Sequence, residues 1–142
     1  MSRRQARELA LQALFQLDLN PADSAGNVAE ACKAAIEAAL AEHEGGISSR
    51  NKEFVENLVK GTMDNREKID AIVSSCARDW SIDRMAGVDR NIARMAVYEL
   101  KFQEEKLTAN IVINEAVELA KKYGTDDSGR FINGLLSAVP NK

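Results

Sequence analysis

The arginines at the start of the chain supply the most distinctive chemistry in this sequence. Arg3, Arg4 and Arg7 fall within the first seven residues, and no acidic residue precedes Glu8. A guanidinium group presents a planar fork of N–H donors that suits phosphates and the edges of bases. The net charge of the chain is −3, but a local basic patch decides phosphate contacts more than the total charge does. The first function that the residues suggest is therefore recognition of an anionic ligand.

Catalytic and metal chemistry finds little support in the residue types. His43 is the only histidine, and Cys32 and Cys76 lie far apart without a C-x-x-C spacing. The sequence also lacks a glycine-rich phosphate loop, an H-E-x-x-H motif and a Ser–His–Asp set. A zinc site, a disulfide scaffold and nucleophilic catalysis are disfavoured, and a reducing cytoplasm fits best. We predict a protein that binds rather than an enzyme, with no metal and no cofactor.

A second group of basic residues lies on the central helix, which we predict over residues 88–102. Apolar residues cover most of the circumference of this helix, which is typical of a helix inside a bundle. Arg90, Arg94 and Lys101, at spacings of four and seven, form the remaining polar strip. We expect this strip to face water. Glu99 falls within the apolar arc, and we favour a structural hydrogen bond for it over a role as a catalytic acid.

The elements that must position these residues are helices. The 142 residues are 45% hydrophobic and 29% charged, strong helix formers dominate, and no run of about 18 apolar residues could span a membrane. Periodicity predicts an all-α fold of about seven helices and no credible strand. The helices are expected at 2–17, 24–42, 48 or 49 to about 60, about 66–78, 88–102, 109–123 and 128–138.

Phe15 and the segment before the last helix add two further candidate features. On a helical wheel Phe15 lies opposite the apolar stripe of the first helix, so it is either a second packing contact or part of a binding surface. Thr125-Asp126-Asp127-Ser128 is a cluster of residue types that cap helices. We therefore expect the carboxylates there to cap rather than to catalyse.

Three segments together resemble the NusB family of bacterial transcription antitermination factors. They are SRRQARELALQALFQ at the start, VDRNIARMAVYEL in the centre and INEAVELAKKYGTDDSGRFINGLL near the end. The last segment is the most specific, because it joins INEAVELAK to F-I-N-G-L-L through a glycine-containing turn. The resemblance covers nearly the whole chain and is weakest over residues 20–48.

The resemblance implies both a fold and a function. The family's fold is two small helical bundles packed together, here one NusB-like domain over 1–142, with sub-bundles at about 1–80 and 81–142. Members bind the single-stranded boxA element of ribosomal RNA operons together with NusE, a small-subunit ribosomal protein. The pair then helps to assemble the antitermination complex on RNA polymerase, and no enzymatic activity is implied.

Candidate site residues follow by matching positions. Arginine suits phosphates and base edges, an aromatic ring can stack on an unpaired base, and short polar side chains can contact base edges. Asp127 should either cap the last helix or accept a hydrogen bond from a base amino group, and Phe131 either packs in the core or stacks on a base. The predicted RNA-binding set is Ser2, Arg3, Arg4, Arg7, Gln12, Arg90, Arg94, Asp127, Ser128, Arg130 and Phe131.

The predicted partner surface is separate from these RNA contacts. We place Phe15 and Asp89 at the NusE contact, with Asp83 and Arg84 nearby. Two other functions remain open: the RNA-binding part of a ribosomal RNA cytosine methyltransferase, and a protein-interaction module without an RNA role. The sequence also leaves open whether the free protein is a monomer or a homodimer.

Overall fold

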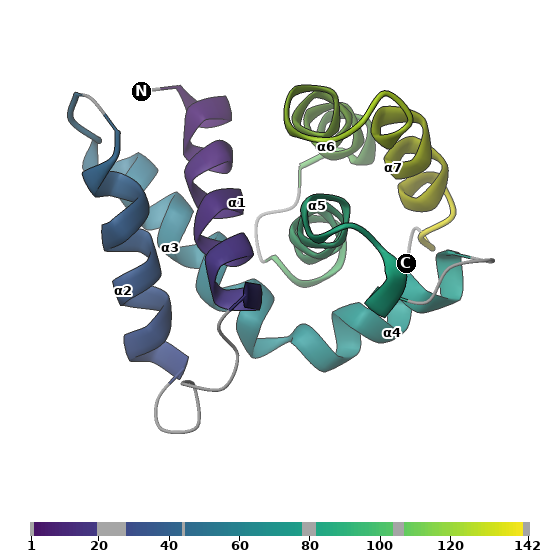
Figure 1. Cartoon of the computed structure of the whole chain (residues 1–142), viewed down its shortest axis with the longest axis horizontal. Coiled ribbons are helices and arrows are strands. Elements are labelled where there is room, and N and C mark those ends of the chain that lie inside the picture. The colour runs from purple at the N-terminus through teal and green to yellow at the C-terminus, as the bar shows by residue number, and fades with distance from the viewer. Residues whose placement is uncertain (1, 20–27, 44, 78–81, 104–106, 141–142) are drawn as a thin grey trace. The chain divides into compact units, whose positions relative to one another are not determined.

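The computed structural model describes residues 2–19, 28–43, 45–77, 82–103 and 107–140, and all the regular secondary structure within them is helical. The predicted all-α class with seven α-helices is confirmed, and none of these helices is both long and apolar enough to cross a membrane. In chain order (Figure 1) the elements are α1 (Arg3–Leu19), α2 (Val28–Ala41), α3 (Ser49–Asp64), α4 (Arg66–Cys76), the 3₁₀ turn η2 (Ile82–Arg84), α5 (Gly87–Val97), the π-helical turn η3 (Tyr98–Phe102), α6 (Ala109–Tyr123) and α7 (Ser128–Ser137).

The chain divides into two compact units, residues 1–63 and residues 64–142. The division comes earlier than the boundary that we expected near residue 80, which lies outside the described residues. The helix break predicted at residues 61–65 is present, because Asn65 separates the end of α3 from the start of α4. Since α4 packs against α5, it belongs with the second unit rather than the first.

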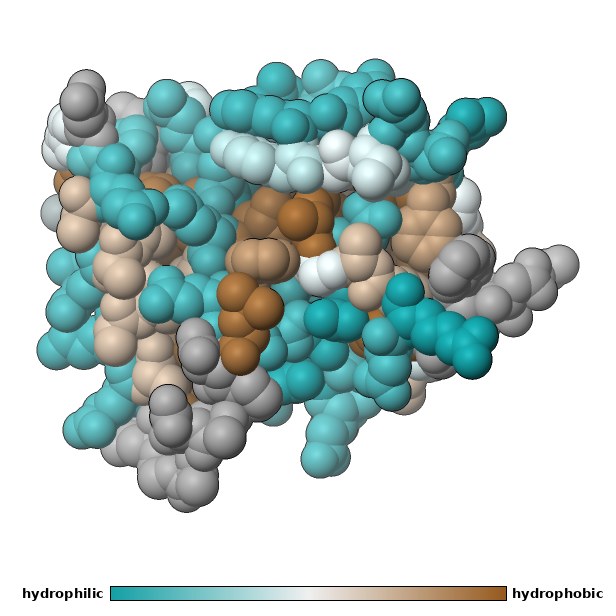
Figure 2. Space-filling view, viewed as in Figure 1, coloured by the Kyte–Doolittle hydropathy of each residue, from teal (hydrophilic) through white to brown (hydrophobic). Residues whose placement is uncertain are grey.

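The first unit is built on the packing of α1 against α2. The apolar stripe of α1 is buried as predicted, and its buried residues include Ala6, Leu9, Ala10, Ala13, Leu14 and Leu17. The alanine-rich α2 buries Cys32, Ala35, Ile36 and Ala39. Most of its other alanines, including Ala34 and Ala38, are exposed, and Figure 2 shows the resulting weakly hydrophobic surface over α2.

The second unit is organised around α5, which packs against α4, α6 and α7. All residues from Asn91 to Glu99 are buried, so the prediction of a helix inside a bundle is confirmed. The helix continues into η3, where Gln103 donates its backbone N–H to the Tyr98 carbonyl oxygen at 3.0 Å. The predicted single helix to Phe102 therefore ends in a wider π-helical turn. Glu99 is buried as expected, with 2% of its surface exposed.

The prediction that the basic strip of α5 faces water is wrong for two of its three members, Arg90 and Arg94. Arg94 is 5% exposed, and its Nε and Nη2 donate to the two carboxylate oxygens of Asp70 on α4 at 2.8 and 3.1 Å. Arg90 is half-buried, and its Nη1 donates to the carbonyl oxygens of Ile82 and Met85 at 3.3 and 3.1 Å. The acceptors come from α4 and from the segment around η2. Helical periodicity places the arginines together but does not show what covers them.

Asp70→Ala should destabilise the protein by about 3 kcal/mol, because it leaves the Arg94 guanidinium buried without its carboxylate partner. We place the cost at the lower end of the range for buried pairs because the Asp70 side chain is 24% exposed. Denaturant unfolding followed by circular dichroism measures the change.

The matched control for this prediction is Glu67→Ala on the same helix. Glu67 is exposed, and we expect a change below about 0.5 kcal/mol. Combining Asp70→Leu with Arg94→Met should recover most of the lost stability, because it removes both buried charges at once. Equal stabilities for Asp70→Ala and Glu67→Ala would show that the ion pair does not support the packing of α4 on α5.

Candidate nucleic-acid interface

Two exposed arginines lie at the N-terminus of α1, within the first unit. The Ser2 hydroxyl oxygen accepts the backbone N–H of Gln5 at 3.1 Å, and the Gln5 side-chain oxygen accepts the backbone N–H of Ser2 at 2.9 Å. This reciprocal capping box confirms that Ser2 caps the helix. It holds the backbone of Arg3 and Arg4 in the first turn, where the helix dipole favours an anion. Both arginine side chains are exposed.

Arg7 does not share this exposure, contrary to our expectation. It is 4% exposed, and its Cζ lies 5.1 Å from the centroid of the Phe54 ring on α3. The Cζ of Arg3 lies 4.2 Å from the same centroid. Arg7 therefore packs inside the first unit, and Arg3 lies at its surface. The sequence placed Arg7 correctly on α1 but did not show that α3 would cover it.

Gln12 is exposed and lies about one and a half turns beyond Arg7 on α1. Its amide nitrogen donates to the Glu42 carboxylate at 3.0 Å. The contact joins the middle of α1 to the residue that follows α2. An exposed hydrogen bond of this kind contributes little to stability and is easily exchanged, so Gln12 can still contact a ligand.

A pocket in the second unit brings together residues from both predicted surfaces. Its volume is about 400 Å³. The sequence had assigned Asp127, Ser128 and Phe131 to RNA, and Arg84 and Asp89 to a protein partner; all five line this pocket. The remaining lining residues, which the sequence did not single out, are Met85, Ala86 and Thr125. Asp83 is exposed on η2, outside the lining.

The turn between α6 and α7 is closed by Ser128 rather than by Asp127. The Ser128 hydroxyl oxygen accepts the backbone N–H of Thr125 at 2.9 Å, and Ser128 is 2% exposed. Asp127 makes no side-chain cap, so the first of the two roles predicted for it, capping of α7, is excluded. Ser128 is also less free to contact a base than we expected, because its hydroxyl is bonded within the turn.

Asp127 instead pairs with Arg130 at the surface. The Arg130 Nη2 donates to Asp127 Oδ1 at 2.9 Å, and both side chains are 85% exposed. Such an exposed pair is weak and opens readily. The arginine therefore offsets the repulsion between Asp127 and a phosphate while both side chains stay accessible.

Two pocket residues have intermediate burial that fits contact with a ligand. Phe131 is half-buried, so part of its ring packs in the second unit while the side chain also lines the pocket. Asp89 is half-buried in the first turn of α5, and its Oδ1 has no hydrogen-bond donor among the described residues. An unmatched buried acceptor is costly, and a ligand or partner that donates to it would remove that cost.

Phe15 on α1 has a side chain of intermediate exposure. It is half-buried, which agrees with neither a fully packed core residue nor a free surface ring. Its neighbour on the same face of the helix, Leu11, is 5% exposed. The predicted role of Phe15 in partner binding therefore concerns only the part of the ring that remains accessible.

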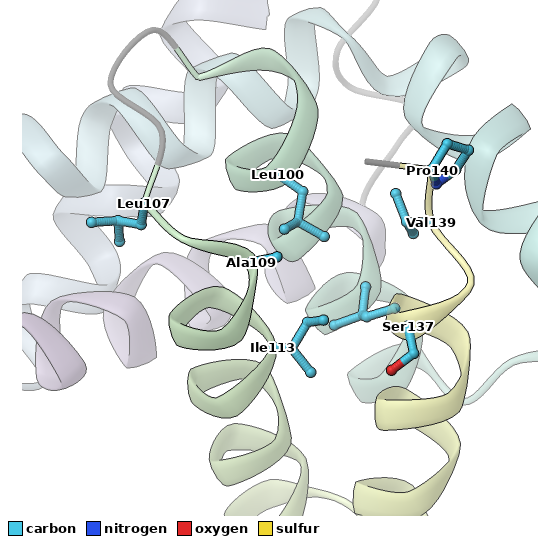
Figure 3. Close-up of a pocket in the computed structure, with 8 residues that line it drawn as sticks. Leu100, Leu107, Ala109, Ile113, Ser137, Val139 and Pro140 are labelled. Atoms are coloured by element: carbon cyan, nitrogen blue, oxygen red, sulfur yellow. The ribbon is translucent and has the colours of Figure 1, made fainter. Parts of the chain in front are cut away.

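A second pocket of about 190 Å³ lies elsewhere in the second unit (Figure 3). It is lined by side chains from η3, from the start of α6, from the end of α7 and from the residues that follow α7, including Leu100, Ile113 and Val139. None of the predicted site residues lines it. The lining residues are mostly apolar and none is charged, so the pocket does not fit an anionic ligand.

Gly124→Ala should destabilise the turn between α6 and α7 by about 2 kcal/mol. A Cβ at this position would overlap the Ser128 hydroxyl and lie 2.8 Å from the Ala120 carbonyl oxygen. The alanine must therefore displace the hydroxyl that closes the turn, or move the end of α6. Thermal and denaturant unfolding measure the loss.

Gly134→Ala provides the matched control for this prediction. Gly134 lies within α7, and a Cβ there meets no atom within 4 Å. It should stabilise the protein by roughly 0.5–1 kcal/mol, because alanine has the higher helix propensity. If Gly124→Ala were as stable as Gly134→Ala, the turn would not depend on the close approach of Ser128.

Comparison with known proteins identifies close relatives of the chain. The sequence profile of the NusB family matches residues 4–141. The transcription antitermination protein NusB of Pelotomaculum thermopropionicum is 47% identical over 139 residues, which cover 98% of this chain and 89% of that protein. The NusB protein of Bdellovibrio bacteriovorus is 44% identical over 138 residues, covering 97% and 94%.

Solved structures agree with the sequence comparison. A structure of T. maritima NusB superposes with a TM-score of 0.81 at 30% identity, covering 98% of this chain and 90% of that one. A crystal structure of the antitermination factors NusB and NusE in complex with dsRNA matches with a TM-score of 0.76 at 32% identity, covering 96% and 94%.

Proposed function

Because the chain belongs to the NusB family of transcription antitermination proteins, we propose that it binds boxA-type RNA together with NusE. The observation that carries the RNA part is the pair of exposed arginines, Arg3 and Arg4, at the capped N-terminus of α1. Charged donors at a positive helix end attract phosphate. The family relationship supports NusE as the partner, since a related structure holds NusB, NusE and RNA.

The pocket in the second unit adds groups that suit an unpaired base. Phe131 offers part of an aromatic ring for stacking, and Asp127 offers exposed carboxylate oxygens. Arg130 lies outside the pocket lining and adds an exposed guanidinium paired with Asp127. Arg90 and Arg94 leave the proposed RNA-binding set, because both have carbonyl or carboxylate acceptors inside the second unit. The proposal relies on binding alone and requires no catalytic step, and its place is in the antitermination complex on RNA polymerase.

Binding of a single-stranded boxA-type RNA, measured by fluorescence anisotropy with and without NusE, tests this function. We expect binding that weakens steeply as salt rises, since phosphate contacts release counterions. NusE should increase the affinity. A double-stranded RNA of the same sequence is a second probe. No binding to either RNA in the presence of NusE would leave a protein-interaction module as the better description.

Arg3→Ala combined with Arg4→Ala should weaken RNA binding roughly tenfold and lower the salt slope by about 0.7 for each phosphate that is no longer neutralised. The fold should be unaffected, because both side chains are exposed. Salt titration of the anisotropy signal gives the affinity and the slope together.

Lys33→Ala combined with Lys60→Ala is the matched control for the arginine variant. It removes the same charge from two exposed positions in the first unit. We expect it to change RNA affinity far less. Equal losses from the two double variants would mean that total charge, and not the N-terminal arginine pair, drives binding.

Phe15→Ala should weaken NusE binding by roughly thirtyfold while RNA binding by the isolated protein changes little. Aromatic residues that become buried at an interface commonly contribute about 2 kcal/mol or more, and Phe15 is still half-buried in the free protein. Calorimetric titration of NusE into each protein measures the effect.

Leu19→Ala on the same helix is the control for Phe15→Ala, because Leu19 is 66% exposed. Thermal unfolding of both variants shows whether either has lost its fold. Loss of RNA binding with unchanged NusE binding in Phe15→Ala would reverse our assignment of this residue to the partner surface.

A further inference from the structure

Phe54 contacts two of the arginines that the sequence assigned to RNA. Its ring centroid lies 4.2 Å from the Cζ of Arg3 and 5.1 Å from the Cζ of Arg7. Phe54 is 8% exposed and Arg7 is 4% exposed, whereas Arg3 is exposed. All three residues belong to the first unit. The buried ring is therefore held in place by its surroundings and supports a surface guanidinium.

A guanidinium held by a ring differs from one held by a carboxylate. The attraction between a cation and a ring face uses no N–H donor. No described carboxylate pairs with Arg3, so its forked donors remain available to a phosphate. An ion pair would instead occupy those donors and would have to break before RNA could bind.

Restraint of Arg3 before binding also lowers an entropic cost. An unrestrained arginine side chain on the surface samples many rotamers, and it loses this conformational entropy when it binds a ligand. Here the capping box between Ser2 and Gln5 holds the backbone at Arg3, and Phe54 restrains the far end of its side chain. Both ends of Arg3 are thus positioned by the protein itself.

We propose that Phe54 is a positioning residue for RNA binding, which holds the Arg3 guanidinium over its ring with the N–H donors free for a phosphate. This inference rests on the proposed function, because it assumes that Arg3 contacts RNA. Phe54 itself need not touch the RNA. Its effect on affinity should therefore depend on the presence of Arg3.

A double-mutant cycle between Arg3 and Phe54 tests the proposal, with the full-length protein and a single-stranded boxA-type RNA as the probe. Phe54→Leu should lower RNA affinity about two- to fivefold when Arg3 is present, which is the strength of an exposed cation–π contact. In the Arg3→Ala background the same change should lower affinity by less than about 1.5-fold. Phe54→Tyr keeps the ring and should restore wild-type affinity.

A purely structural role for Phe54 gives a different pattern. Phe54→Leu would then weaken binding equally with and without Arg3, and that result overturns the proposal, as does an unchanged affinity for Phe54→Leu. The control is Val59→Ala on the same helix, where Val59 is fully buried. It should lower stability while leaving RNA affinity unchanged.

An NMR measurement on the wild-type protein tests the same contact. It needs no RNA, and it does not depend on whether a variant folds. In the wild-type protein the Arg3 side-chain protons should be shifted upfield by the ring current of Phe54. Signals at random-coil positions would overturn the proposal. If the wild-type protein fails to bind RNA while the ring-current shift is present, the proposed function fails and Phe54 merely orders a surface arginine.

Discussion

A guanidinium group stays charged at any pH that a protein meets, so wherever one is buried the fold must supply acceptors for it. The second unit depends on this constraint at Arg94. The bidentate ion pair between Arg94 and Asp70 joins α5 to α4, and the Asn91 side-chain oxygen is a third acceptor for Arg94 at 3.4 Å. Because α5 also packs against α6 and α7, the orientation of this one helix sets the position of the rest of the unit.

The same constraint distinguishes arginines that support the fold from arginines that are available to a ligand. Arg90 and Arg94 are committed to acceptors within the second unit, and Arg7 is buried beside Phe54. Arg3, Arg4 and Arg130 remain exposed. A chain with a net charge of −3 can therefore still present local positive charge at the N-terminus of α1 and in the first turn of α7. This distribution favours binding to a defined anionic ligand over general attraction to polyanions.

The turn between α6 and α7 shows how a structural requirement shapes a candidate binding surface. Ser128 closes the turn through its hydroxyl, and Gly124 leaves the space that this hydroxyl occupies. Asp127 makes no side-chain cap and lies at the surface, where it pairs with Arg130. Phe131 follows one turn later and lines the pocket together with Asp89. Residues assigned to RNA and residues assigned to a protein partner thus share one pocket.

The sequence alone determined the fold class, the seven helices and the burial of α5, because the spacing of apolar residues along a helix is a local property. The family relationship was indicated instead by the resemblance of three segments to the NusB family, and the sequence placed Arg3, Arg4 and Arg7 together at the start of the first helix. Which arginines would be buried could not be predicted, because Asp70 and Phe54 are distant in the chain and periodicity says nothing about them. The same holds for Asp127, which makes no side-chain cap, while the Ser128 hydroxyl closes the turn by accepting the Thr125 backbone N–H. Charge at a position is set by the residue type, but its accessibility is decided only when another element packs over it.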